Sequence, residues 1–153
     1  MAAVALRRSS PDAEPGRSLL AEFADEIAAL YPGWDPSRGP TARPEEISPP
    51  SGRFLVAYLG DRPVGCGALK RLDASTAEVK RIFVRPDARG AGVARALLDA
   101  LEEAARAAGY ARVRLDTGDR LPRAEALFRS SGYREIPDYN GNPYAALWFE
   151  KLL

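Results

Sequence analysis

The chain has 153 residues, enough for one well-buried core and too few for two ordinary domains, so we expect a single domain over residues 1–153. Its 22 Lys and Arg nearly balance its 21 Asp and Glu, which argues against the strongly positive field of a nucleic-acid or anionic-membrane binder. A single Cys rules out an intrachain disulfide, and the lack of His removes the ordinary zinc sites and the usual base of Ser and Cys hydrolases.

The expected partners are therefore small, mobile substrates, with no metal. No apolar run approaches the length of a membrane span, and the first residues lead to Arg7 and Arg8 without the apolar stretch of a signal peptide. We expect a cytoplasmic protein. Abundant Ala, Arg, Gly and Pro suggest a bacterial genome rich in G and C.

The amino-terminal third combines a strand, a helix and a long loop. Val4–Arg8 alternates as an edge strand does, and apolar residues at helical spacing predict an amphipathic helix over Ser18–Leu30. Six prolines between Pro32 and Gly52 exclude a long helix or a central strand. This segment is predicted to be a loop with one short helix near Glu45 and Glu46.

Three strands are predicted next, from apolar segments between turn residues. Phe54–Leu59 and Val64–Leu72 flank a Gly-Asp-Arg-Pro turn and should form a hairpin, and Ala77–Val84 follows a polar turn. We expect an antiparallel meander.

The period then changes to that of a helix. Ala91–Ala108 carries an apolar stripe with charged residues on its other face, and Gly109 is placed to end the helix. Ala111–Asp116 alternates and follows directly. Together with Ala77–Val84, these segments predict a central β-α-β unit with parallel strands.

The carboxy-terminal part is predicted to add a helix over Pro122–Ser130 and two strands, Tyr133–Ile136 and Ala145–Lys151, around a turn rich in Asn, Gly and Pro. The expected fold class is α/β (α+β). It combines a mixed sheet of six or seven strands, an antiparallel amino-terminal meander, the central parallel unit and flanking helices.

The turn before the long helix is the most informative segment. It consists of Arg89, Gly90, Ala91, Gly92, Val93 and Ala94. The first amides of a helix have no partner within it and carry partial positive charge. Gly90 and Gly92 lack a Cβ, so a phosphate can approach the backbone, and Arg85, Arg89 and Arg95 add positive charge. These features favour a bound pyrophosphate; the alternative is a solvated helix start whose glycines serve only tight packing.

Around this turn the sequence resembles the GNAT superfamily of N-acetyltransferases, in particular its small bacterial members. The family signature, Gln/Arg-x-x-Gly-x-Gly/Ala after the fourth strand, is met by Arg89, Gly92 and Ala94. Three further segments resemble the family's third strand, fourth strand and fourth helix: Val64–Leu69, Glu78–Val84 and Ala124–Tyr133.

The resemblance implies acetyl-coenzyme A as the acetyl donor, held where the fourth and fifth strands splay apart. It implies that the pantetheine arm pairs with the fourth strand and that a backbone amide near Val84 polarises the thioester carbonyl. The expected cofactor-binding residues are Ile82, Phe83, Val84, Arg89, Gly90, Ala91, Gly92, Val93, Ala94, Arg95 and Phe128.

Glu78 is the candidate general base, because family members often place a base on this strand. The alternative is a solvent-facing strand residue that only pairs with Lys80 on the same face. Lys80 could equally hold an acidic group of the substrate.

The usual proton donor of the family, a Tyr in the pattern Asn-x-x-Ala-x-x-Leu-Tyr, is missing. Its places hold Leu121, Ala124, Leu127 and Phe128. Because Phe128 has no hydroxyl, the leaving thiolate must receive its proton from another residue, from water or from the acceptor ammonium. We favour Tyr144 over Tyr139; the alternative for either is a ring that only packs.

The predicted function is transfer of an acetyl group from acetyl-coenzyme A to a primary amine of a small molecule or an amino-acid-like acceptor. The loop Pro32–Gly52 and the turn near residue 140 should shape the acceptor site, with Tyr31 and Trp34 as its walls or as core anchors. The alternative is a non-catalytic acetyl-coenzyme A sensor, which the missing Tyr at position 128 would suit. An exposed late strand would allow a homodimer.

Overall fold

The computed structural model describes residues 3–153, so Met1 and Ala2 of the expected domain lie outside it. Its strands are β1 (Val4–Arg8), β2 (Arg53–Leu59), β3 (Arg62–Arg71), β4 (Thr76–Val84), β5 (Arg112–Thr117), β6 (Arg134–Ile136) and β7 (Leu147–Leu152). The α-helices are α1 (Gly16–Leu30), α2 (Val93–Ala107) and α3 (Pro122–Ser130). Short 3-10 helices lie at Pro36–Arg38, Pro44–Ile47 and Pro86–Ala88, so the proline-rich loop holds two short helices where one was expected.

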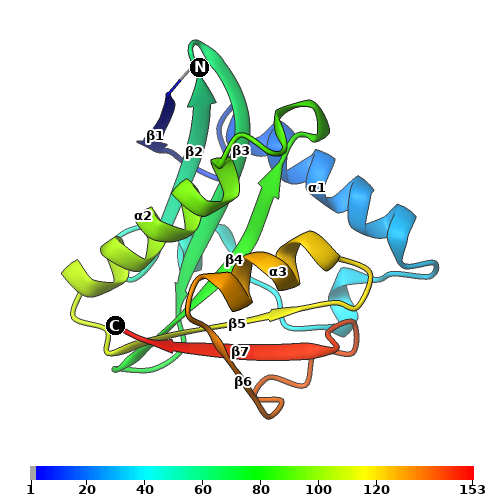
Figure 1. Ribbon diagram of the computed structural model, residues 1–153, viewed down its shortest axis with the longest axis vertical. Coiled ribbons are helices and arrows are strands. Elements are labelled where there is room, and N and C mark those ends of the chain that lie inside the picture. The colour runs from blue at the N-terminus through cyan, green and yellow to red at the C-terminus, as the bar shows by residue number, and fades with distance from the viewer. Residues whose placement is uncertain (1–2) are drawn as a thin grey trace.

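The strands form one mixed sheet in the order β1-β2-β3-β4-β5-β7-β6 (Figure 1). Among the described strands β4 and β5 are the parallel pair, and the other neighbours run antiparallel. The predicted fold class, with its meander and central parallel unit, is confirmed. No helix within residues 3–153 combines the length and apolar character that crossing a bilayer requires.

Helices cover both faces of the sheet. In Figure 1 α2 and α3 lie in front of it, over the larger core cluster, which includes Leu97, Leu101, Leu115 and Phe149. The amphipathic α1 packs on the opposite face, where Leu19 joins the second cluster. Successive strand side chains point to opposite faces, so each strand contributes to both cores.

The parallel strands β4 and β5 are paired only at their beginning. Their register runs from Thr76 opposite Arg112 to Glu78 opposite Arg114, after which the two strands diverge, as Figure 1 shows. Arg81 lies beyond this point with φ +58°, at a register shift between β3 and β4. Such a β-bulge bends a strand and re-aims its side chains. The splayed geometry implied by the family resemblance is therefore present.

Candidate active site

A cleft of about 1320 Å³ occupies the space where β4 and β5 diverge. Residues from α1, the loop after it, both diverging strands, the glycine turn, α3 and the turn before β7 all line it. Nearly every residue singled out in the sequence therefore contributes to one space. Ala91 is the exception among the predicted cofactor-binding residues, because it is exposed and does not line the cleft.

The glycine turn forms one end of the cleft. Gly90 and Gly92 have φ +87° and +80°, and a Cβ built on either would meet no heavy atom within 4 Å. Gly92 is also the N-cap of α2, and no side chain in residues 3–153 caps that helix start. The first turn carries no acidic residue. Open space, unoccupied side-chain caps and the positive end of a 15-residue helix together fit a bound pyrophosphate.

Only two of the three arginines near this turn line the cleft. Arg89 lines the cleft and bonds to the Val84 carbonyl (2.9 Å) and to Glu26 (2.6 Å), and Arg95 lines it with a hydrogen bond to Ser130 Oγ (2.7 Å). Arg85 does not line it. Its guanidinium forms an ion pair with Glu22 at 2.7 Å, so the charge expected from Arg85 is directed elsewhere.

The diverging edge of β4 forms the middle of the cleft. Ile82, Phe83 and Val84 all line it and lie beyond the residues that pair with β5. Ile82 and Val84 pack on the α2 side of the sheet, and Phe83 packs on the α1 side. This strand edge therefore has backbone groups that can pair with an extended ligand.

Phe128 lies in the cleft wall formed by α3 but is mostly buried, at 6% exposed. Its ring packs against Tyr133 and Phe149, each with a centroid distance of 6.0 Å. The structure thus gives Phe128 a packing role, with one part of the side chain at the cleft.

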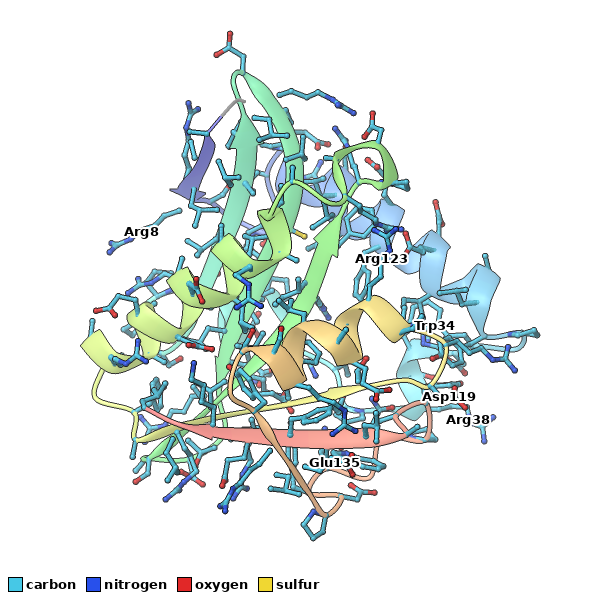
Figure 2. All side chains as sticks on the ribbon, viewed as in Figure 1. Arg8, Trp34, Arg38, Asp119, Arg123 and Glu135 are labelled. Atoms are coloured by element: carbon cyan, nitrogen blue, oxygen red, sulfur yellow. The ribbon has the colours of Figure 1, made fainter. Side chains whose placement is uncertain are left out.

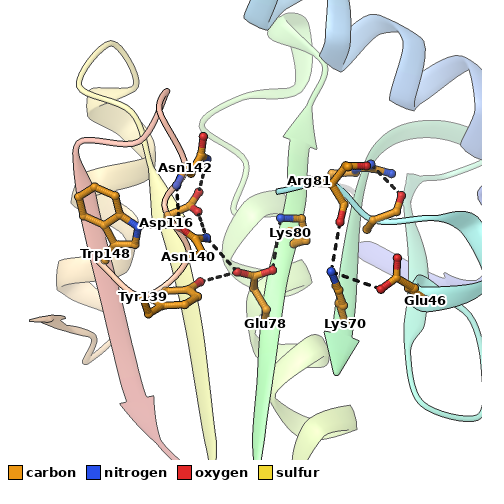
Figure 3. Close-up of polar contacts among 12 residues, drawn as sticks. Glu46, Lys70, Glu78, Lys80, Arg81, Asp116, Tyr139, Asn140, Asn142 and Trp148 are labelled. Atoms are coloured by element: carbon orange, nitrogen blue, oxygen red, sulfur yellow. Dashed lines mark hydrogen bonds and ion pairs between the residues drawn. The ribbon is translucent and has the colours of Figure 1, made fainter. Parts of the chain in front are cut away.

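Glu78 lies at the other end of the cleft, where β4 and β5 part (Figure 3). It is only 2% exposed. Tyr139 donates its hydroxyl proton to the Glu78 carboxylate at 2.5 Å, and Lys80 Nζ lies 3.3 Å from it. The pairing with Lys80 is present, but the alternative of a solvent-facing residue is wrong. Burial, and then the adjacent Glu78 charge, raises the pKa of Tyr139, so this phenol keeps its proton.

A second carboxylate, Asp116 of β5, lies beside Glu78 in the cleft. Asn140 Nδ2 donates to Asp116 at 2.5 Å and to Glu78 at 3.4 Å, and therefore bridges the two carboxylates (Figure 3). Trp148 Nε1 fixes the amide by donating to Asn140 Oδ1 at 2.9 Å. Burial raises the pKa of the Asp116 carboxyl, although the Asn140 hydrogen bond and the Lys80 charge oppose that effect.

The mouth of the cleft is lined by aromatic side chains. Tyr31, Trp34 and Tyr144 all contribute, and Figure 2 shows Trp34 on the side where α1 and α3 face each other. The Tyr144 hydroxyl accepts a hydrogen bond from the Asp35 amide at 2.8 Å, which joins the proline-rich loop to the turn before β7. These two segments border the cleft together.

Comparison with known proteins identifies the class of fold and site. The sequence profile of the Acetyltransferase (GNAT) family matches residues 20–133. A protein named "IAA acetyltransferase" from Azospirillum brasilense is 35% identical over 98% of this chain and 98% of its own length. The chain therefore belongs to the Acetyltransferase (GNAT) family.

Solved structures share the fold at lower sequence identity. A GNAT-family acetyltransferase from Staphylococcus aureus Mu50 has a TM-score of 0.78 at 19% identity, covering 98% of this chain and 99% of its own. The PaiA N-acetyltransferase of Thermoplasma acidophilum, in complex with coenzyme A, has a TM-score of 0.74 at 16% identity, covering 99% of each chain.

Proposed function

We propose that this chain is an acetyl-coenzyme A-dependent N-acetyltransferase that acts on the primary amine of a small molecule or an amino-acid-like acceptor by direct attack on the thioester. The observation that carries this proposal is the continuity of the cleft. One space joins the uncapped helix start at Gly90 and Gly92 to the buried Glu78 carboxylate. A phosphate site at one end and a proton acceptor at the other would thus share a single cleft.

The cofactor would lie along the first part of this channel. The first-turn amides of α2 would hold the pyrophosphate, with Arg89 and Arg95 alongside, and the free edge Ile82–Val84 would pair with the arm. When bound, acetyl-coenzyme A supplies an acetyl group activated as a thioester. The similar fold of the Thermoplasma protein in complex with coenzyme A supports this placement.

Glu78 is the proposed base. It takes one proton from the acceptor ammonium, which frees the nitrogen lone pair to bond to the acetyl carbon. Tyr144 gives its proton to the sulfur, which keeps the electron pair of the broken carbon–sulfur bond. The second proton of the acceptor nitrogen then restores the phenol, so one proton is released for each amine acetylated.

The hydrogen bonds of the two tyrosines favour Tyr144 over Tyr139 as the proton donor. The Tyr139 proton is directed at Glu78, whereas the Tyr144 oxygen only accepts, from Asp35 N, and its own proton stays available in the cleft. We expect Tyr144→Phe to lower kcat about tenfold, since water can partly replace the phenol. Unchanged kcat in this variant would remove Tyr144 from the mechanism.

The acceptor end carries charges of both signs. Glu78 and Asp116 are acidic, and Lys80, whose side chain is 12% exposed, lines the cleft beside Glu78. This combination suits an acceptor whose ammonium faces the carboxylates and whose acidic group faces Lys80. A panel of amines and amino acids, together with IAA because of the Azospirillum relative, is the direct test of acceptor choice.

The cofactor claim is tested by thermal stabilisation with coenzyme A. At one hundred times its dissociation constant the ligand should add about 2.7 kcal/mol to the free energy of unfolding. Gly92→Asp and Gly90→Asp should remove this gain by placing an acidic side chain at the phosphate site. Gly60→Asp is the matched control, because Gly60 has φ +61° and open space but lies outside the cleft.

Turnover separates an enzyme from a sensor. Release of free thiol from acetyl-coenzyme A that depends on an added amine supports the transferase. Stabilisation by coenzyme A without any amine-dependent thiol release would favour the sensor instead.

A further inference from the structure

The hydroxyl of Thr117 is buried without a hydrogen-bond partner. Thr117 is 6% exposed, and among the side-chain nitrogen and oxygen atoms buried within residues 3–153, its Oγ1 is the one that lacks a partner. Thr76, the other buried threonine in this part of the chain, receives a hydrogen bond from Arg112 Nη1 at 3.0 Å. An unpaired buried hydroxyl destabilises a fold, so its retention calls for an explanation.

Thr117 faces the cleft from the end of β5. Its face of the strand is the buried one, shared with Val113 and Leu115, both of which belong to the core under α2 and α3. Asp116 lies on the opposite face, with Asn140. Thr117 and Leu115 line the cleft, and β4 has already left β5 at this position. No neighbouring β4 backbone is paired with β5 there.

The part of α3 that borders the same space after Arg123 is apolar. Ala124, Leu127 and Phe128 line the cleft and offer no side-chain hydroxyl. The Thr117 hydroxyl is therefore a polar group that shares the cleft with the apolar side chains of Leu115, Leu127 and Phe128. A ligand with hydrogen-bonding atoms on an extended chain would satisfy it, whereas an apolar ligand would not.

We propose that the Thr117 hydroxyl hydrogen-bonds to the sulfur-bearing arm of coenzyme A, so that one stabilising partner is supplied only when the cofactor binds. This inference rests on the proposed function. The arm is the expected ligand because Thr117 lies on the α2 and α3 side of β5, and the first turn of α2 forms the phosphate end of the same cleft. The carboxylates proposed to face the acceptor amine, Glu78 and Asp116, both accept hydrogen bonds from Asn140 on the other face.

The substitution Thr117→Val tests this directly, because it replaces the hydroxyl with a methyl group of similar shape. The melting temperature of the ligand-free protein should stay the same or rise, since an unpaired polar group is removed. The dissociation constant for coenzyme A should rise about fivefold to tenfold, the value of one hydrogen bond. Affinity for ADP, which has the pyrophosphate but no arm, should not change.

Thr76→Val is the matched control. Thr76 is also a buried strand threonine, but its hydroxyl already has a partner within the protein and does not line the cleft. We expect this variant to melt at a lower temperature and to bind coenzyme A as the unsubstituted chain does. The two threonines should therefore respond in opposite ways.

The outcomes distinguish this inference from the function on which it rests. If the unsubstituted chain is not stabilised by coenzyme A, the proposed function fails and the inference fails with it. If the chain binds coenzyme A and Thr117→Val binds it equally well, the inference alone is overturned. A fall in melting temperature like that of Thr76→Val would also overturn it, because the hydroxyl would then have its partner inside the protein.

Discussion

Two glutamates of this fold are buried to nearly the same extent, Glu78 at 2% exposed and Glu102 at 3% exposed, and each has a tyrosine and a lysine among its partners. Glu78 is bonded by Tyr139 and paired with Lys80, and Glu102 is bonded by Tyr133 at 2.8 Å and by Lys151 at 2.8 Å.

The two glutamates differ in whether they line the cleft. Glu78 lines the cleft, together with Lys80 and a second carboxylate, Asp116. Glu102 does not line it, because it lies on the buried side of α2 and ties that helix to β7. Burial and partner type thus fail to distinguish the proposed catalytic carboxylate from the structural one, and only contact with a ligand-sized space distinguishes them.

The largest expected effect is the loss of activity in Glu78→Gln. Without a proton acceptor the acceptor amine stays charged, so kcat/KM for amine-dependent thiol release should fall by about 10²–10⁴-fold. The fold should survive for two reasons. The glutamine carbonyl can still accept a hydrogen bond from Tyr139, and the Lys80 ammonium still has a negative charge near it, that of Asp116. Activity within twofold of the unsubstituted enzyme would exclude Glu78 as the base.

Glu102→Gln should show the reverse pattern. Breaking a buried ion pair costs about 3–5 kcal/mol, but the Lys151 side chain is 24% exposed and can be partly solvated. We therefore expect the free energy of unfolding to fall by about 2 kcal/mol in chemical denaturation. The folded fraction should bind coenzyme A normally, and weakened binding would show that Glu102 influences the cleft.

Substituting the tyrosine partner of each glutamate should have a smaller effect than substituting the glutamate itself. Tyr133→Phe should lower the free energy of unfolding by about 1 kcal/mol and leave kcat/KM unchanged. Tyr139→Phe should lower kcat/KM about threefold, because the Glu78 carboxylate loses the hydrogen bond that holds it in place. A Tyr139 that only packs would leave kcat/KM unchanged.

Local sequence signals predicted most of the fold. Pro122–Ser130 has the bounds expected from its proline start and from the glycine after its end, and the glycine turn lies where the signature placed it. These features depend on residues close together in the chain. The β-bulge at Arg81 was not predicted, because a non-glycine residue at positive φ has no local signature.

The acceptor end of the site was harder to predict. Two hydrogen-bond partners of the buried Glu78, Tyr139 and Asn140, lie some sixty residues later on a turn whose packing no periodicity describes. Asp116 was missed although a signal existed. Alternation along Ala111–Asp116 puts it on the polar face, and parallel pairing with Ala77–Val84 brings that face beside Glu78.

The smallest expected effect is a difference in how stability depends on pH. Burial raises the pKa of Asp116, so its contribution to stability is present below its unfolded value near 3.8 and is lost as the pH rises through the folded value. The Arg134 hydrogen bond lowers the pKa of Glu150, a carboxylate outside the cleft. Its contribution is present above its unfolded value near 4.5 and is lost as the pH falls.

Asp116→Asn and Glu150→Gln should therefore change the pH dependence of unfolding with opposite signs. Relative to the unsubstituted chain, Asp116→Asn should gain stability as the pH rises from about 4 to 7, because the buried charge is gone. Over the same range Glu150→Gln should lose stability, because the favourable charge is gone. Denaturation midpoints measured at several pH values give both slopes. Equal slopes would mean that the cleft carboxylate is solvated as well as the one paired with arginine, and the electrostatic distinction between the two regions would disappear.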